Sequence, residues 1–205
     1  MGALNKAVDL DPWEIMWAPY DDQTYSLVLE EIQPDDIVLE IGAGDLRLAY
    51  RISAKAHQVL AIEIKEDILT VGLKKRNFQV PSNLKIQVGD ARLVEFPGNI
   101  TTAVLLMRHC THFTHYTKKL RQAGCARLIT NARWGMGVEV VNLLDKRIAY
   151  KDLDLGWYAC WCGGVGFKVG PPELIHPELD RIVHEVVDCP ACQAVVSAHD
   201  SQLSA

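Results

Sequence analysis

The sequence predicts a doubly wound α/β fold followed by a small carboxyl-terminal extension. Over the first 150 residues, short apolar runs alternate with amphipathic helical segments, and such runs are typical of strands buried on both faces of a parallel sheet. A glycine turn follows the first apolar run, as it does in many nucleotide-binding sheets. After about residue 150 the chain becomes rich in glycine, aromatic residues and cysteine. We therefore expect a larger unit over residues 1–150 and an extension over residues 151–205.

Each predicted element has its own pattern. Tyr25, Val28 and Ile32 recur at helical spacing after two candidate cap residues, Asp21 and Asp22. The apolar run DIVLEI that follows is the first expected strand. Further strands are expected at 58–64, 84–90, 101–107 and 126–132, with helices at 46–55, 67–76 and 114–122, and a hairpin at 156–170. Right-handed crossovers between the strands would give a parallel sheet with helices on both faces.

The composition is that of a soluble globular chain. Of the 205 residues, 49% are hydrophobic and 23% are charged, and the formal net charge is −5. This acidic balance argues against a broad nucleic-acid-binding surface. The amino-terminal segment carries acids and lacks a long apolar core, so we expect neither a signal peptide nor a membrane anchor, and we expect a cytoplasmic protein. Six cysteines without a secretion signal favour thiols or a metal over disulfides.

The charges around the glycine turn favour one kind of ligand over another. Gly42 and Gly44 would let the backbone approach a ligand, but the dinucleotide fingerprint G-x-G-x-x-G needs a third glycine where this chain has Arg47. Glu40 adds a carboxylate just before the turn, which disfavours a phosphate. A cofactor with a cationic centre and no phosphate, such as S-adenosylmethionine, fits these charges better. Without a ligand, the same two glycines would form an ordinary tight turn.

Two more acids end successive predicted strands. Glu63 ends the second strand, where a carboxylate can accept hydrogen bonds from both hydroxyls of a ribose. Asp90 ends the third strand and is placed to accept from an adenine amino group. Either acid alone would be an ordinary surface residue at a strand end. Together with Glu40, they predict a cofactor site at the carboxyl edge of the sheet.

The segment from Glu40 to Arg47, E-I-G-A-G-D-L-R, resembles the cofactor motif of the class I S-adenosylmethionine-dependent methyltransferases. The nearest likeness is to small proteins with D-L-G-S-G-D-G-R, a group that includes mitochondrial protein-lysine methyltransferases. Leu46 replaces the usual third glycine of that motif. The likeness extends over roughly residues 17–140 and is specific for the cofactor rather than for the substrate.

The resemblance implies a set of cofactor contacts. Glu40 would contact the methionine end of S-adenosylmethionine, and Glu63 would contact the ribose. Asp90 and Ala91 would contact the adenine. The full set of cofactor-binding residues expected in this way is Glu40, Gly42, Gly44, Asp45, Glu63, Asp90 and Ala91.

The methyl acceptor is not predicted by any motif. The segment 107–113, MRHCTHF, stands where enzymes that methylate amino groups of nucleic acids carry D-P-P-Y or N-P-P-Y, and the Y-L of the lysine-directed group is also missing. A protein side chain and a small molecule therefore both remain candidate methyl acceptors, and nucleic acid ranks behind both. His109 is a candidate general base, although it equally suits a polar loop. With His112 and His115 it would share one face of a helix.

The cysteines of the extension occur as two pairs. Cys160 and Cys162 lie on the predicted hairpin, and Cys189 and Cys192 form a C-P-A-C turn. Two such pairs suit one tetrahedral structural zinc ion, which would stabilise a segment too small to have its own core. The alternative is two unconnected pairs of buried or free thiols.

These observations together predict a methyltransferase that uses S-adenosylmethionine and a structural zinc ion. An alternative of another class is a non-catalytic binding module that keeps the cofactor fold and presents the zinc hairpin to a partner. The missing acceptor motif in segment 107–113 motivates that alternative. The oligomeric state is not predicted.

Overall fold

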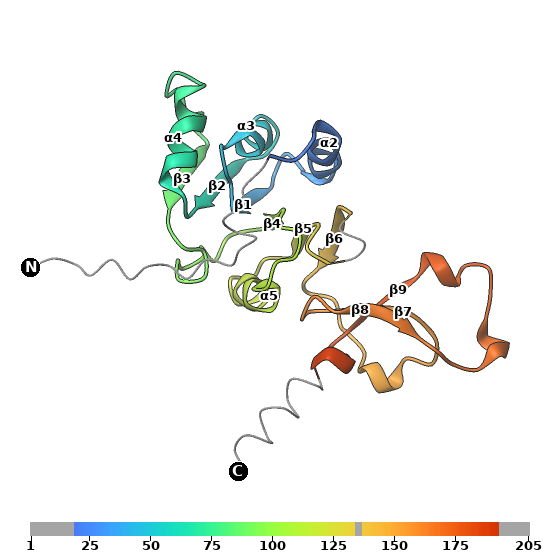
Figure 1. The fold of residues 1–205 in the computed structure, drawn as a ribbon. Coiled ribbons are helices and arrows are strands. Elements are labelled where there is room, and N and C mark those ends of the chain that lie inside the picture. Colours follow the sequence, from blue (N-terminus) through green and yellow to red (C-terminus); the bar gives the residue numbers. More distant parts are fainter. Residues whose placement is uncertain (1–18, 134–136, 193–205) are drawn as a thin grey trace, which may run out of the picture.

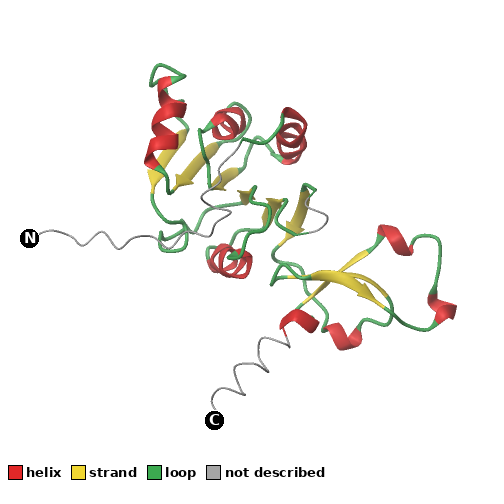
Figure 2. Cartoon of the chain, in the orientation of Figure 1, coloured by secondary structure: helices red, strands yellow, loops and turns green. Residues whose placement is uncertain are grey.

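The computed structural model describes residues 19–133 and 137–192, shown in colour in Figure 1. The expectations for the amino-terminal segment therefore lie outside the described residues. Two sheets are present, a larger one built from the first part of the chain and a smaller one built from the last part (Figure 2). The α/β class predicted for the first part is confirmed.

The larger sheet has six strands in the order β3-β2-β1-β4-β5-β6. The strands are β1 (Ile37–Ile41), β2 (Gln58–Glu63), β3 (Leu84–Val88), β4 (Thr102–Leu105), β5 (Arg127–Thr130) and β6 (Glu139–Asn142). The first five are parallel, as predicted, and β6 pairs antiparallel with β5. The order reverses between β1 and β4, so the carboxyl ends of these two strands flank the position at which such sheets bind ligands.

Helices cover both faces of this sheet, because its central strands are apolar on both sides. The helices α2 (Asp22–Glu31), α3 (Arg47–Ser53) and α4 (Glu66–Lys74) pack on one face, and α5 (Phe113–Gln122) packs on the other (Figure 1). Of the two candidate caps, Asp21 is the one used: its carboxylate accepts from the Thr24 N–H at 2.7 Å.

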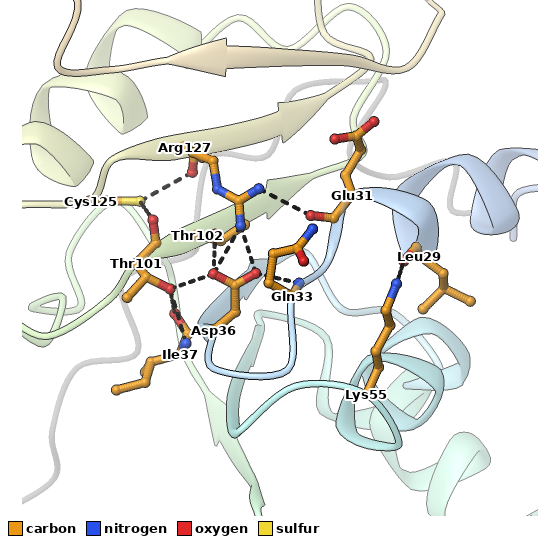
Figure 3. A network of polar contacts seen from close by, with 10 residues as sticks. All are labelled: Leu29, Glu31, Gln33, Asp36, Ile37, Lys55, Thr101, Thr102, Cys125 and Arg127. Atoms are coloured by element: carbon orange, nitrogen blue, oxygen red, sulfur yellow. Dashed lines mark hydrogen bonds and ion pairs between the residues drawn. The ribbon is translucent and has the colours of Figure 1, made fainter.

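A polar network fastens the amino ends of three neighbouring strands (Figure 3). Asp36, which precedes β1, accepts from the hydroxyls of Thr101 and Thr102 at 2.8 Å each. Both of its oxygens also accept from the Arg127 guanidinium, at 3.0 and 2.7 Å. Burial raises the pKa of Asp36, but the hydrogen bond from the Gln33 N–H at 2.7 Å, together with those from Thr101, Thr102 and Arg127, outweighs burial and holds the pKa below its usual value. The network lies at the amino ends of the strands, so its role is structural.

We expect Asp36→Asn to lower the free energy of unfolding by about 2 kcal/mol, since the amide loses the charge that Arg127 and two hydroxyls contact. The lowered pKa of Asp36 means that its contribution is present above the pKa of the unfolded chain and is lost as the pH falls through the folded pKa. Urea unfolding of both proteins at several pH values measures this. The difference between them should shrink towards acid pH, and a constant difference would contradict the assignment.

The smaller sheet has three strands in the order β8-β7-β9. The strands β7 (Gly156–Cys160) and β8 (Val165–Lys168) form the predicted hairpin, and β9 (Val183–Val186) pairs parallel with β7. Short 3₁₀ helices η2 (Tyr150–Asp152), η3 (Pro172–Leu174) and η4 (Leu179–Arg181) lie in its connections. Ile148 bridges Val186, so pairing with this sheet begins just before residue 150. The division into units at that residue stays a prediction.

A buried arginine joins the two sheets. The Arg133 side chain is only 1% exposed, and its guanidinium pairs with Glu139 on β6 and with Glu185 on β9. Burial lowers the pKa of Arg133, but the two carboxylates outweigh burial and raise the pKa above its usual value. This pairing links the two sheets through one cation.

Among the described residues, no helix has both the length and the apolar character needed to cross a bilayer.

Candidate cofactor pocket and cysteine cluster

A pocket of about 590 Å³ opens at the carboxyl ends of β1 to β4. This size lies within the range of small-molecule sites. Six of the seven predicted cofactor residues line it: Glu40, Gly42, Asp45, Glu63, Asp90 and Ala91. The seventh, Gly44, contacts Glu63 through its backbone. The expected residues are therefore gathered at the edge of the sheet where the sequence placed them.

The turn after β1 depends on left-handed backbone conformations. Gly42 and Gly44 have φ angles of +75° and +54°, and Leu46 has +65°. The N–H groups of Gly42 and Ala43 both donate to the carbonyl of Ile62, which ties the turn to β2. Left-handed geometry suits glycine but strains leucine. Leu46 tolerates this strain because its side chain is fully buried in the core.

Replacing Leu46 with glycine therefore has two opposite effects. Relief of the left-handed backbone would gain about 1–2 kcal/mol, whereas emptying a buried leucine site costs about 3–5 kcal/mol. We expect Leu46→Gly to lower the free energy of unfolding by about 2 kcal/mol, as measured by chemical denaturation. A variant more stable than the natural protein would show that backbone strain dominates at this position.

The Glu63 carboxylate is held in place by two backbone donors. One oxygen accepts from Gly44 N–H at 2.8 Å and the other accepts from Lys65 N–H at 2.9 Å. The residue is only 5% exposed. Because each carboxylate oxygen has two lone pairs, both oxygens keep capacity for a further donor from the pocket. A pair of ligand hydroxyls would match this arrangement.

Asp45 and Asp90 each pair with the arginine two residues later. The Arg47 guanidinium lies 2.6 Å from Asp45, and the Arg92 guanidinium lies 2.8 Å from Asp90. Burial raises the pKa of both acids, but the hydrogen bonds from their arginines outweigh burial and lower it. The negative charges of both carboxylates are therefore balanced by arginines of the chain itself.

Glu40 differs from these acids. It is 5% exposed, and its Oε2 atom has no hydrogen-bond partner among the described residues. Burial, followed by repulsion from Glu63 and Asp45, raises the pKa of Glu40 to about 8. A buried acceptor without a donor is unfavourable in the free protein, and a cationic ligand group would relieve it.

The segment after β4 forms the opposite wall of the pocket. The backbone N–H of Arg108 donates to the Tyr20 hydroxyl at 3.2 Å, and the Arg108 guanidinium carbon lies 5.3 Å from the centre of the Tyr20 ring. Both side chains line the pocket. Tyr20 lies upstream of α2, so the segment before α2 closes one side of the pocket. Lys65 also lines it, and no sequence pattern singled Lys65 out.

The three histidines do not lie on one helix, so the possibility of a shared helical face is not realised. His109 lies in a turn with φ of +60°, whereas α5 begins at Phe113. His112 contacts Arg92 at 3.0 Å, and His115 contacts the Arg92 carbonyl at 3.0 Å. His109 is exposed and lines the pocket, so its role as a general base stays a prediction.

The four cysteines of the extension lie together. Their sulfur atoms are all within 4.8 Å of one another. Cys160 and Cys189 are 1% exposed, and Cys162 and Cys192 are half-buried. The two pairs come from the carboxyl end of β7 and from the segment after β9, so it is the parallel pairing of these strands that brings them together. The alternative of two spatially unconnected pairs is therefore wrong.

Comparison with known proteins gives partial sequence matches. No protein-family model matches the chain. A probable ribosomal RNA small subunit methyltransferase A from Methanosarcina barkeri is 43% identical over 67 residues, which are 33% of this chain and 23% of that protein. A protein of the same description from Methanosphaera stadtmanae is 38% identical over 80 residues, 38% of this chain and 29% of that protein. The matched region thus spans about a quarter of the length of these relatives.

Comparison with solved structures gives weak overall similarity. A tRNA methyltransferase from Aquifex aeolicus has a TM-score of 0.48 and 22% identity, covering 56% of this chain and 47% of that one. A dimethyladenosine transferase from Plasmodium falciparum has a TM-score of 0.46 and 21% identity, covering 54% of this chain and 41% of that one.

Proposed function

We propose that the protein is an S-adenosylmethionine-dependent methyltransferase. The observation that carries the proposal is the buried Oε2 atom of Glu40, which faces the pocket region without a hydrogen-bond partner in the described part of the chain. A cofactor with an ammonium group would supply the missing donor. The partial sequence matches to proteins named as methyltransferases agree with this choice. When bound, the cofactor supplies an electrophilic methyl group on its sulfonium.

The charges of the pocket disfavour a phosphate-bearing cofactor. Glu40 and Glu63 both lie at the carboxyl ends of the central strands, and no arginine pairs with either among the described residues. A pyrophosphate placed beside the Glu63 carboxylate would be repelled, and a phosphate oxygen cannot supply the donor that Glu40 Oε2 lacks among the described residues. Glu40 suits a positively charged ammonium, and Glu63 suits the neutral hydroxyls of a ribose. In the proposal, Glu40 orients the methionine end and Glu63 accepts from the ribose.

The adenine end would lie near Asp90 and Ala91. Because the Asp90 carboxylate is engaged by Arg92, an adenine amino group would share that carboxylate with the guanidinium. The acceptor would enter beside Arg108 and His109 of the segment after β4 and beside Tyr20 of the segment before α2. Methyl transfer is an in-line displacement that depends on positioning. His109 is placed to remove a proton from the acceptor if the acceptor carries one.

The acceptor class is proposed more broadly than the sequence alone indicated. The net charge of −5 ranks nucleic acid behind proteins and small molecules, but the relatives are named as ribosomal RNA methyltransferases. RNA is therefore a third candidate class of methyl acceptor, beside protein side chains and small molecules. The alternative of a non-catalytic module is not favoured, because the partial sequence matches are to proteins named as methyltransferases.

Calorimetric titration tests the cofactor. We expect both S-adenosylmethionine and S-adenosylhomocysteine to bind with one site per chain, and NAD to give no heat. Binding of NAD in place of S-adenosylmethionine would overturn the proposal. Transfer from methyl-tritiated S-adenosylmethionine into a cell extract then identifies the acceptor class, because ribonuclease or protease treatment releases label from RNA or protein respectively, and label in the low-mass fraction marks a small molecule.

A further inference from the structure

The sulfur atoms of the four cysteines have the spacing of a tetrahedral metal site. In a zinc site with four Zn–S bonds of about 2.3 Å, each S···S edge is about 3.8 Å. The distance from Cys162 to Cys189 is 3.4 Å, and the distances from Cys192 to Cys160 and to Cys189 are 3.6 and 3.8 Å. These are close to the tetrahedral edge and far longer than an S–S bond of about 2.05 Å. The cluster therefore has the dimensions of a metal centre.

The turn that follows the first cysteine pair is shaped around the sulfur atoms. Gly164 donates its backbone N–H to Cys162 Sγ at 3.3 Å. A Cβ atom on Gly164 would lie 3.1 Å from the sulfurs of both Cys162 and Cys189, tighter than side chains normally pack. Gly163 has a φ of +87°, which also favours glycine. An N–H aimed at a sulfur stabilises a thiolate, the form that binds metal.

The positive charge of a buried arginine beside the cysteine cluster is only partly balanced. The Arg147 side chain is 1% exposed and forms an ion pair with Glu185, but none of its three guanidinium nitrogens makes a well-oriented hydrogen bond among the described residues. Burial lowers the pKa of Arg147 to about 10, and the charge of a Cys160 thiolate acts in the opposite direction. Four thiolates with one Zn²⁺ carry a net charge of −2. Such a centre would supply the negative charge that Arg147 lacks.

The cysteine turn also contacts the larger sheet's helix α5. Trp161 lies between Cys160 and Cys162 in the sequence, and the guanidinium carbons of Arg121 and Arg147 lie 3.6 and 4.1 Å from its ring centre. Arg121 belongs to the last turn of α5. Gly163 faces Phe113 at the first turn of α5, since a Cβ there would lie 3.8 Å from it. The turn therefore contacts both ends of this helix.

We propose that Cys160, Cys162, Cys189 and Cys192 bind one zinc ion, and that this ion holds the Trp161 turn against α5. The site is separate from the cofactor pocket, so this proposal stands or falls independently of the methyltransferase activity. The smaller sheet has few buried apolar residues of its own. A metal that crosslinks the ends of β7 and β9 supplies the stability that a core of this size cannot.

Elemental analysis of the full chain, purified without chelator, tests the metal. We expect one zinc per chain, and X-ray absorption at the zinc edge should show four sulfur neighbours at about 2.3 Å. Less than half an equivalent, a site with nitrogen or oxygen neighbours, or thiols already joined as disulfides in fresh protein would overturn the assignment. The absorption measurement uses the natural protein, so it does not depend on whether a variant folds.

Cysteine variants test the ligand set. Cys162→Ser and Cys189→Ser should lose bound zinc, whereas Cys110→Ser should keep a full equivalent, because Cys110 lies outside the cluster. Retention of a full equivalent by both cluster variants would contradict the proposal. If either variant fails to fold, the zinc neighbours of the natural protein decide the question.

Hydrogen exchange tests the contact with α5. Trp161→Ala should keep one zinc per chain but raise the exchange rates of amides in Phe113–Gln122 on the order of tenfold. Trp157→Phe, which keeps an aromatic ring in edge-to-face contact with Phe167, should leave those rates unchanged. Removal of zinc from the natural protein should raise exchange in the smaller sheet and in α5. Unchanged α5 rates in both Trp161→Ala and the zinc-free protein would refute the second part of the proposal.

Discussion

Replacing Glu63 with alanine should weaken the binding of S-adenosylmethionine on the order of 1,000-fold, because each hydrogen bond from a ribose hydroxyl to a carboxylate contributes about 1.5–3 kcal/mol. The substitution also removes the acceptor that fixes Gly44 N–H at 2.8 Å, so the turn beside the cofactor loses its orientation. Calorimetric titration of the natural and variant proteins measures the change. The expected loss is large because Glu63 acts on the ligand and on the turn together.

Glu66→Ala is the matched control for this experiment. Glu66 lies three residues further along the chain, in the first turn of α4, and its side chain is exposed. The Glu66→Ala variant should bind the cofactor with an affinity within about twofold of that of the natural protein. If Glu63→Ala binds S-adenosylmethionine as tightly as Glu66→Ala does, then Glu63 does not contact the ribose and the proposed cofactor site is wrong.

Glu40→Gln should make the protein more stable at pH 8 by about 4 kcal/mol while weakening its cofactor binding. The pKa of Glu40 is raised from 4.5 to about 8 in the folded protein. Between these two values the folded chain holds a proton that the unfolded chain has released, so the stability of the natural protein falls as the pH rises from 4.5 to 8. Glutamine cannot ionise, and the variant avoids this loss.

Urea unfolding at pH 5 and at pH 8 measures the effect. The two proteins should differ little at pH 5 and clearly at pH 8, where about half of the folded natural protein has ionised a carboxyl that is 5% exposed and the unfolded chain is fully ionised. A variant that is less stable than the natural protein at pH 8 would mean that the Glu40 carboxylate has a partner in the folded protein. Glu40 would then stabilise the fold and would not be available to bind a ligand.

Cofactor affinity should have the opposite dependence on pH. An ammonium beside Glu40 favours the ionised carboxylate, so binding at lower pH must first release the proton. We expect the affinity of the natural protein for S-adenosylmethionine to rise with pH up to about 8 and then to level off. In Glu40→Gln, calorimetry should show weaker binding with little change over this range. If the affinity of the natural protein did not depend on pH, Glu40 would not contact the ammonium group of the cofactor.

Much of the fold follows from local patterns. The apolar runs predict the five parallel strands, and the helical periodicity predicts α2, α3, α4 and α5 to within a few residues. These patterns are readable because a strand buried on both faces must be apolar throughout, and a covering helix must have one apolar face. The edge strand β6 was missed. It has only four residues, and Glu139 and Asn142 at its ends are polar, so nothing in its sequence distinguishes it from a loop.

The cofactor site was predicted as a set of residues, but their chemical states were not. Sequence alone assigned Glu40, Asp45 and Asp90 to the cofactor site but did not indicate which of them has a charge partner in the chain. In the structure, Asp45 and Asp90 are each paired with an arginine, whereas Glu40 keeps a buried oxygen that has no partner within residues 19–133 and 137–192. That difference depends on which side chains the fold places around each carboxyl.

The amino-acid sequence by itself determined the class of fold, the edge of the sheet that carries the glycine turn, and the residues gathered there. It did so because strand ends and glycine turns are local features. Only the tertiary structure decided that the four cysteines meet at one point and that Trp161 lies against α5. Those contacts join segments that are close only after β7 and β9 have paired, and the energy of a buried charge or a metal centre depends on that proximity.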